Sequence, residues 1–306
     1  MKKLIRGAVV GLVAALALSA CGGGDSGNDN PLAGGGKDGT VTVGGANFPE
    51  SNLLAEIYAQ ALEAKGVKVT RKFNIGAREV YYDQVVKGGI SVMPEYNGAL
   101  LTTSVDENSK AATTEEINAE LKAKLPASVE ILDSAEAEDK DSVTVNQQTA
   151  SKYNLKSIED LKDVADELVI AGPSEFETRQ QGLKGLKEVY GLEFKEFRPF
   201  DAGAQSTLVK LLTENKIQAA DLFTTDPTIE QNKLVVLEDP KNVFSAQNVT
   251  PLVHKESVND TARAALNAVS AKLTTEDLLA MMKRVVIDKD DQEKVAEDWL
   301  KKSGLA

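Results

Sequence analysis

Residues 73–101, FNIGAREVYYDQVVKGGISVMPEYNGALL, predict a strand, a helix and a second strand joined by glycine turns. Gly76 allows a backbone conformation that most residues avoid, and the pair Gly88 and Gly89 ends the helix. Between these turns, tyrosine and valine recur four residues apart, which is typical of a helix with one buried face. The recurring pairs are Tyr81 with Val85 and Tyr82 with Val86.

A polar and aromatic cluster follows the second strand of this stretch. The strand is short and apolar, and we expect Pro94 to stop it. Glu95, Tyr96 and Asn97 then place a carboxylate, an aromatic ring and an amide on a loop at the carboxyl end of a strand. Open α/β sheets bind their ligands at such ends. A ligand-contacting loop and a solvated turn with Tyr96 packed inward are both compatible with this pattern.

The same alternation of strands and helices extends over the chain from residue 41 onward, which predicts an α/β fold. We expect a helix over about 50–65, a second over about 176–190, and an all-helical C-terminus from about 258 to 300, with turns near residues 274 and 288. Two blocks of alternation predict two lobes with a cleft between them, with the chain crossing near residues 141 and 247. An acidic run over 136–141 lacks the glycine and spacing of a calcium loop, so we interpret it as a solvated connection.

Length and charge limit the class of protein. A chain of 306 residues usually forms two domains. The net charge of −12 argues against nucleic acid as a partner and is compatible with cationic or zwitterionic ligands. The sequence has no glycine-rich phosphate loop and no histidine-based metal cluster, so we expect no cofactor and no metal. An enzyme is disfavoured, because His254 has no nucleophile in a recognisable frame and nothing fixes the separation of Glu50 and Glu95 as a glycosidase pair.

The N-terminus predicts export and lipidation. A basic segment with Lys2, Lys3 and Arg6 precedes the apolar run 7–20, GAVVGLVAALALSA. Residues 18–21, Leu-Ser-Ala-Cys, resemble the lipobox of bacterial lipoproteins, in which the cysteine carries the lipid after cleavage. We therefore predict a signal peptide over 1–20, lipidation of Cys21 and a glycine-rich flexible tether over 21–40.

Five ordered segments of the chain resemble the binding proteins of ABC importers for osmoprotectants such as glycine betaine, choline and carnitine. They are GANFPE (45–50), MPEYNG (93–98), PSEFETR with GLKGL (173–179 and 182–186), ADLFTTD (220–226), and LEDP with Phe244 and PLV (237–240 and 251–253). The resemblance covers essentially all of residues 41–306. It implies the two-lobed fold of type II periplasmic binding proteins, with one lobe formed by 41–140 and 247–306 and the other by 141–246.

The resemblance also implies a set of ligand-binding positions. The family holds quaternary ammonium groups against aromatic faces by cation–π attraction, and Tyr96 falls on the first of its four tyrosine positions. At the other three positions this chain has Asp141, Phe223 and Gln247. The matched motifs add further candidates: Asn47, Phe48, Glu50, Ser51, Asn97, Arg179, Thr225 and Asp226. A cleft of this composition suits a polar cation or zwitterion, whose carboxylate Arg179 would take.

The functional prediction is an extracytoplasmic solute-binding lipoprotein. Its expected partners are a small ligand, the transmembrane subunits of an ABC permease and the cell membrane, which it contacts through its lipid; we expect a monomer. Two alternatives remain open: a binding protein for another polar solute, such as an amino acid or an ergothioneine-like compound, and a lipoprotein that senses its ligand without importing it.

Overall fold

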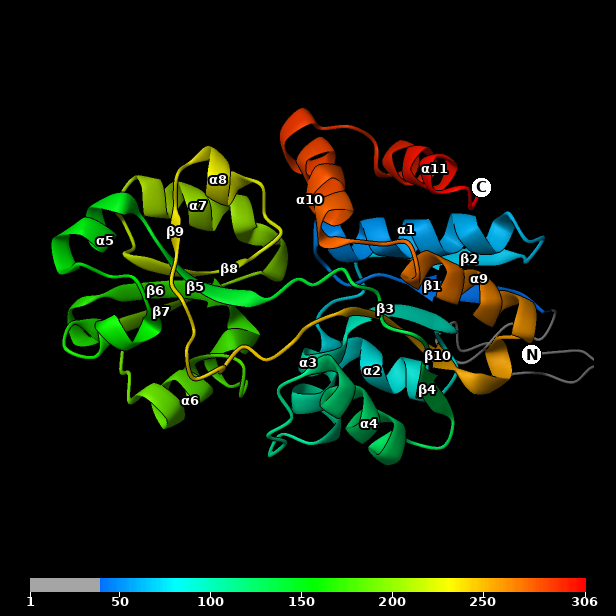
Figure 1. Ribbon diagram of the computed structural model, residues 1–306, viewed down its shortest axis with the longest axis horizontal. Helices are drawn as coiled ribbons and strands as arrows, with labels where there is room; N and C mark the ends of the chain where they lie inside the picture. Colours follow the sequence, from blue (N-terminus) through cyan, green and yellow to red (C-terminus); the bar gives the residue numbers. More distant parts are fainter. Residues whose placement is uncertain (1–38) are drawn as a thin grey trace, which may run out of the picture. The chain divides into compact units, whose positions relative to one another are not determined.

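The computed structural model describes residues 39–306. The predicted signal peptide, the lipidation site Cys21 and residues 21–38 of the predicted tether lie outside the described residues. Within 39–306 the chain forms two five-stranded sheets with helices packed against them, which confirms the predicted α/β fold (Figure 1).

The first sheet has the strand order β2-β1-β3-β10-β4. Strands β1, β2 and β3 are parallel, whereas β10 runs antiparallel to β3 and to β4. The strands are β1 (Val41–Gly44), β2 (Val69–Lys72), β3 (Val92–Tyr96), β4 (Val129–Ile131) and β10 (Val249–His254). Because β10 joins this sheet only after the second sheet is complete, the sheet is built from both ends of the described chain.

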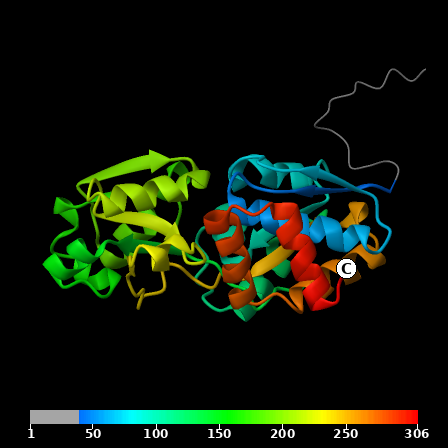
Figure 2. The same ribbon diagram turned by 90° about the horizontal axis from the view of Figure 1, so that it is seen from above.

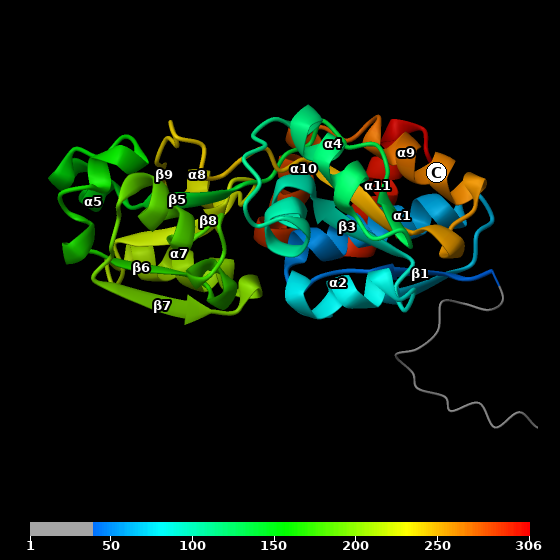
Figure 3. The same cartoon turned by 90° about the horizontal axis from the view of Figure 1, so that it is seen from below.

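Helices cover both faces of the first sheet because successive strand side chains point to opposite faces. Val43 and Val92 pack against α1, α9, α10 and α11, which Figure 2 shows from above. Met93 and Leu252 pack on the other face against α2 and α4, which Figure 3 shows from below. The helical segments of this part are α1 (Pro49–Glu63), α2 (Arg78–Val86), α3 (Asn97–Leu100), a π-helical turn (Leu101–Val105), α4 (Thr114–Lys124), a 3-10 turn (Lys255–Ser257), α9 (Asp260–Ser270), α10 (Thr275–Lys283), a second π-helical turn (Arg284–Asp288) and α11 (Gln292–Ser303).

The second sheet has the order β7-β6-β8-β5-β9 and repeats the pattern of the first, with two parallel pairs followed by two antiparallel pairs. Its strands are β5 (Asp141–Val145), β6 (Val169–Pro173), β7 (Glu196–Phe200), β8 (Ala219–Phe223) and β9 (Val235–Val236). The helical segments around it are α5 (Gln147–Tyr153), 3-10 turns (Ile158–Leu161, Ala165–Glu167, Ser174–Glu177, Ala202–Ala204), α6 (Leu183–Gly185), a π-helical turn (Leu186–Tyr190), α7 (Gln205–Thr213) and α8 (Thr228–Gln231).

Two segments connect the sheets, one between β4 and β5 and one between β9 and β10. The segments pair with each other: Glu138 and Asn248 form an antiparallel bridge, and the Asp139 amide donates to the Gln247 carbonyl at 3.1 Å. A two-stranded connection of this kind restrains how the two sheets can move relative to each other. The predicted lobe boundaries at 140/141 and 246/247 lie in or next to these segments and stay predictions.

Two local predictions were wrong. Pro94 does not stop its strand, because it lies opposite Pro251 at a non-hydrogen-bonded position of the antiparallel β3–β10 ladder, where neither nitrogen needs to donate to the other strand. The expected continuous helix over 176–190 is broken into a 3-10 turn, α6 and a π-helical turn. The chain folds back on itself here: a Cβ added to Gly182 would lie 2.1 Å from the Phe176 carbonyl oxygen.

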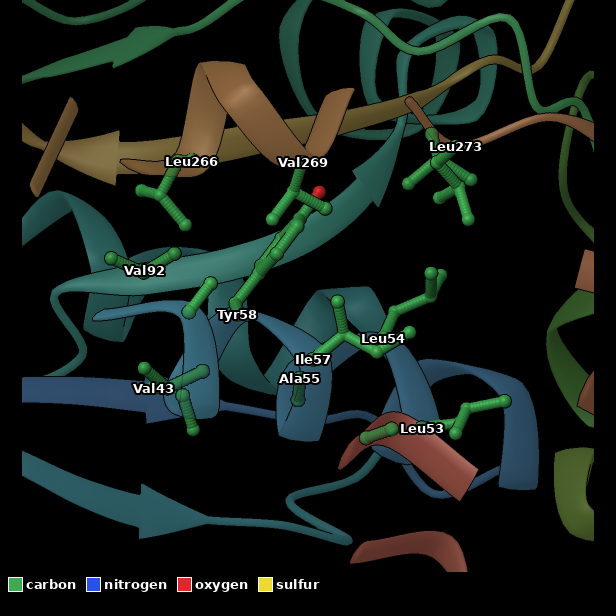
Figure 4. Close-up of a cluster of buried hydrophobic side chains, with 14 of the residues drawn as sticks. Val43, Leu53, Leu54, Ala55, Ile57, Tyr58, Val92, Leu266, Val269 and Leu273 are labelled. Atoms are coloured by element: carbon green, nitrogen blue, oxygen red, sulfur yellow. The ribbon is translucent and has the colours of Figure 1, made fainter. Parts of the chain in front are cut away.

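A buried tyrosine of α1 lies at the centre of the first core. The Tyr58 ring reaches between Val92 of β3 and Val269 of α9 (Figure 4). The side chain is fully buried, and its hydroxyl has no hydrogen-bond partner among residues 39–306. Burial raises the pKa of Tyr58 far above its ordinary value, so the hydroxyl stays protonated.

Replacing Tyr58 with phenylalanine should therefore raise the free energy of unfolding by about 1 kcal/mol, since it removes an unsatisfied polar group and keeps the packing. Tyr190→Phe is the matched control, because the Tyr190 hydroxyl donates to Asp239 and accepts from the Lys241 amide at 2.8 Å. This control should lower stability by about 1 kcal/mol. Urea denaturation measures both changes, and equal losses in the two variants would contradict the prediction.

Candidate functional site

The candidate site lies where strand ends from the two sheets face a common cavity. Parallel strands β1, β3, β6 and β8 contribute their carboxyl ends, whereas antiparallel β5 and β10 contribute their beginnings. These ends lie at one edge of each sheet, which is where α/β sheets bind ligands. The cavity encloses about 60 Å³, so only a small solute fits this arrangement. Its lining consists of Ala46, Asn47, Phe48, Ala77, Arg78, Tyr81, Tyr96, Ala99, Asp139, Asp141, Pro173, Glu175, Phe176, Arg179, Gln181, Ala202, Asp221, Phe223 and Gln247.

Three aromatic rings form one wall of the cavity. The Phe48 ring lies 6.2 Å from Tyr96 and 5.3 Å from Phe223, centroid to centroid, tilted by 31° and 49° respectively. Phe48 comes from the loop after β1, so it joins the ring of the first sheet to that of the second. The wall therefore offers apolar aromatic surface to a ligand from both sheets.

Behind the Tyr96 ring lies a buried hydrogen-bonded carboxyl group. The Tyr96 hydroxyl donates to one Glu50 oxygen at 2.6 Å, and the Thr225 hydroxyl donates to the other. Burial raises the pKa of Glu50, although these two hydrogen bonds act in the opposite direction. Burial, together with the charge of Glu50, also raises the pKa of Asp139 well above its ordinary value. Two neighbouring carboxyl groups thus favour retaining a proton at this position.

Asp139 corrects the interpretation of its acidic run as a solvated connection. The side chain is only 5% exposed and accepts hydrogen bonds from the Thr225 amide at 3.0 Å and the Thr224 hydroxyl at 3.1 Å. The run forms part of the connection between the sheets, so its alternate residues face the cavity rather than solvent. Periodicity over so few residues could not separate a solvated turn from this connecting segment.

A buried ion pair supports the floor of the cavity. Arg78 donates to Glu95 through Nε and Nη2, with a shortest distance of 2.8 Å, and the Tyr81 hydroxyl donates to the same carboxylate at 2.9 Å. Glu95 is fully buried and Arg78 is 7% exposed. The arginine charge is therefore neutralised by the protein itself.

Arg179 connects the two sides of the site. Its Nε and Nη2 atoms donate to the Glu79 carboxylate of α2 at 3.1 and 2.9 Å. Glu175 lies four residues before Arg179 but forms no salt bridge with it, because the chain is not a continuous helix there. Arg179 lines the cavity, but its bidentate edge is already occupied by Glu79.

A chain of amides orients Asp141. The Gln247 side chain donates to Asp141 at 3.1 Å and to the Gln181 oxygen at 2.7 Å, and Gln181 donates to Ser245 at 2.7 Å. Gly98 of α3 packs tightly beside this chain, since an added Cβ would lie 2.2 Å from the Ala246 carbonyl oxygen. The position of Asp141 therefore depends on the connecting segment before β10.

The structure brings seven of the residues predicted for the site into the cavity lining. They are Asn47, Phe48, Tyr96, Asp141, Arg179, Phe223 and Gln247. Glu50, Thr225 and Asp226 line a neighbouring cavity of about 190 Å³ behind Phe48 and Phe223. Ser51 and Asn97 line neither cavity: Ser51 accepts from the Ala46 amide at 2.9 Å, and Asn97 accepts from the Gly98 and Asn248 amides at 2.9 Å each.

Sequence reasoning missed Arg78, Tyr81, Asp139, Gln181 and Asp221 as lining residues. The sequence contains one indication for Tyr81: Tyr81 and Tyr82 are adjacent, and both cannot lie on one narrow buried face of a helix, so one of them could face the cavity. Asp221 precedes Phe223 by two residues on β8, and a strand places such residues on the same face. Nothing in the sequence pattern indicated that Gln181 lines the cavity, because its position depends on how the chain folds back between the 3-10 turn and α6.

Two sheets of the same topology, with a small cavity lined from both, define a two-lobed solute-binding protein of the type II periplasmic class. The chain belongs to the OpuAC family, the substrate-binding domain of ABC-type glycine betaine transport systems, whose family model matches residues 39–302.

The chain is similar in sequence to known proteins along most of their length. The chain is 27% identical to the glycine-betaine-binding protein of Pseudomonas aeruginosa over 87% of this chain and 88% of that protein. It is 26% identical to the glycine betaine-binding protein YehZ of Escherichia coli over 86% of this chain and 90% of that protein. A solved structure of a glycine betaine/carnitine/choline ABC transporter protein shares the fold, with a TM-score of 0.67 and 21% identity over 87% of this chain and 99% of that one.

Within residues 39–306, no helix combines the length and apolar character that a membrane span requires. In the same part of the chain, no three histidine, cysteine, aspartate or glutamate side chains are grouped so that they could hold a metal ion.

Proposed function

We propose that this chain binds a small cationic or zwitterionic osmolyte, of the glycine betaine or choline kind, and delivers it to the transmembrane subunits of an ABC importer without chemical conversion. The observation that carries the proposal is the cavity itself, which is lined by three neighbouring aromatic rings and by several carboxyl groups. The family membership and the glycine betaine named for its relatives support this ligand class.

Aromatic faces and carboxylates suit the same type of ligand for different reasons. A cation within about 6 Å of a ring centroid gains roughly 0.5–2 kcal/mol from the ring quadrupole. A carboxylate adds a full negative charge, which is felt more strongly in a closed cavity than in water. An anion would meet Asp139, Asp141 and Asp221 in the same space, so the proposal excludes anionic solutes.

Calorimetric titration of the purified protein against glycine betaine, choline, carnitine, proline betaine, ergothioneine and amino acids tests the proposal. A ligand at a hundredfold excess over its Kd should stabilise the protein by about 2.7 kcal/mol, which corresponds to a rise in Tm of roughly 5–10 °C. A panel that produces neither heat nor a Tm shift would contradict the proposed function. A ligand that binds but is taken up equally well by cells lacking the protein would favour a sensor over an importer.

Tyr96→Ala should weaken the binding of every accepted ligand by roughly 2- to 30-fold, because it removes one ring of the aromatic wall. Tyr82→Ala is the matched control: Tyr82 is a half-buried tyrosine of α2 that does not line the cavity, so its loss should leave affinity near the wild-type value. Calorimetry on both variants measures the difference. Equal affinities of the wild type and Tyr96→Ala would remove Tyr96 from the site.

We further propose that the protein is held at the outer face of the cell membrane by a lipid on Cys21. The basic segment, the apolar run and the lipobox-like residues 18–21 support this localisation. Cys21→Ser should move the protein from the membrane fraction to the soluble fraction of extracts from the expressing cells. Retention of the variant in the membrane fraction would show that the anchor is not this cysteine.

A further inference from the structure

The charges that line the cavity do not balance. Both arginines are already neutralised, Arg78 by Glu95 and Arg179 by Glu79. Three aspartates of the lining, Asp139, Asp141 and Asp221, form no salt bridge within residues 39–306. Glu175 adds a partly exposed fourth carboxylate. Of the Arg, Asp and Glu side chains in the lining, only carboxyl groups are therefore left without a charged partner among residues 39–306.

Asp221 is the most constrained of these carboxylates. The side chain is fully buried, and neither carboxylate oxygen has a hydrogen-bond partner in the part of the chain that the structure describes. Its position is fixed by packing, since a Cβ added to Gly172 on neighbouring β6 would lie 2.9 Å from the Asp221 Cβ. A buried carboxylate without donors is costly, and native structures rarely tolerate one without a ligand or a proton.

Asp141 lies beside Asp221 on the same face of the second sheet. In the antiparallel ladder Asp141 is opposite Phe223, and Asp221 is opposite Val143, so the two aspartates are diagonal neighbours. One Asp141 oxygen accepts from Gln247, while the other has no hydrogen bond to any of residues 39–306. Three of the four carboxyl oxygens of the pair thus accept no hydrogen bond from residues 39–306, and both residues line the same small cavity.

The charge of Asp141 repels a charge on Asp221. Burial, followed by the charge of Asp141, raises the pKa of Asp221 well above its ordinary value, whereas the nearby Ser142 amide and Arg179 act in the opposite direction. Burial also raises the pKa of Asp141, which the hydrogen bond from Gln247 and the charges of Arg179 and Arg78 oppose. A cation placed between the carboxyl groups would relieve this repulsion.

The geometry points to a ligand whose cationic end carries N–H groups, an ammonium, amidinium or guanidinium, which donate to Asp141 and Asp221 while the rings of Phe48, Tyr96 and Phe223 flank it. This inference rests on the proposed function and narrows its ligand class. A fully methylated ammonium is attracted by the same charges and rings but offers the carboxylates no donor. It would leave both Asp221 oxygens buried and unsatisfied, whereas charge-assisted hydrogen bonds satisfy them.

The test uses two series of ligands that differ only in methylation of the nitrogen: ethanolamine to choline, and glycine to glycine betaine. Calorimetry on the wild-type protein should show affinity falling by at least about tenfold from the least methylated binder to the quaternary member of a series. Asp221→Asn, which keeps the volume but removes the charge, should shift the ratio of the two affinities toward the quaternary member. Asp141→Tyr, which adds a ring in place of a carboxylate, should shift it in the same direction.

Glu177→Gln is the control for long-range charge, because Glu177 is exposed and lies outside the cavity lining but on the segment that carries Glu175 and Arg179. This variant should leave the ratio unchanged. Equal or tighter binding of the quaternary members by the wild type would overturn the inference while leaving the proposed function intact. Binding of no member of either series, or of the wider panel, would overturn the proposed function as well.

Discussion

Replacing Glu95 with alanine should lower the free energy of unfolding by about 3–5 kcal/mol, because it leaves the buried guanidinium of Arg78 without its counter-charge. Glu95 accepts three hydrogen bonds from Arg78 atoms, one from Tyr81 and one from the Tyr96 amide at 3.2 Å. The full set of donors would lose its acceptor at once. Chemical denaturation of the ligand-free protein measures the loss.

A glutamate of an exposed ion pair provides the control. Glu63 bonds Arg71 at 2.6 Å, but its side chain is 42% exposed and Arg71 keeps a second partner in Glu56. Glu63→Ala should therefore cost less than about 1 kcal/mol. A double variant with Arg78→Met and Glu95→Leu should recover much of the loss, since no charge then remains buried. If Glu95→Ala cost no more than Glu63→Ala, the pair would not contribute to stability in the way its burial indicates.

Most of the fold could be predicted because its elements carry local signals. Helix α1 begins at Pro49, next to the predicted start, since proline suits the first turn and apolar residues recur along it. The C-terminal helices end and restart at the predicted turns near residues 274 and 288. The prediction for Pro94 was wrong because strand pairing is non-local: only the register with β10, far along the chain, places residue 94 where its nitrogen needs no partner in the β3–β10 ladder. The prediction of a continuous helix over 176–190 was also wrong because of a contact that the helical pattern does not reveal. The chain packs closely against itself at Gly182, and this interrupts the helix.

The candidate site was less predictable because it is assembled from six strand ends that are far apart in sequence. Tyr96, Phe223 and Asp141 were found because they match the positions of family motifs. Asp221 was overlooked, although it lies two residues before Phe223, because only the cavity shows that its carboxylate lacks a partner. Arg78 shows the converse: it is a positive charge at the start of a helix that lines the cavity, but its partner is Glu95 of β3.

Glu50 joins the two sides of the site through protonatable groups. It begins α1 in the first lobe, and its carboxyl accepts from Tyr96 of β3 and from Thr225 after β8. Asp139 lies beside it, and the charge of Asp226 further raises the pKa of Glu50. Since the raised pKa of both Glu50 and Asp139 comes first from burial, the folded protein binds protons here that the unfolded chain releases.

Glu50 and Asp139 should therefore make the free energy of unfolding fall as the pH rises from about 4 through their raised pKa. The slope is up to about 1.4 kcal/mol per pH unit for each proton that the folded protein retains. Glu50→Gln imitates the protonated carboxyl, so its stability should be close to that of the wild type near pH 4 and should exceed it increasingly at higher pH. Glu63→Gln should show the opposite trend. The hydrogen bond from Arg71 lowers the pKa of Glu63, so the ionised side chain stabilises the folded protein. This stabilisation is fully present above the ordinary pKa of Glu63 and is lost as the pH falls below it. Denaturation curves between pH 4 and 8 at constant ionic strength measure both differences from the wild type, in which contributions from unrelated groups cancel. A difference between Glu50→Gln and the wild type that does not change with pH would show that Glu50 is ionised in the folded protein throughout this range.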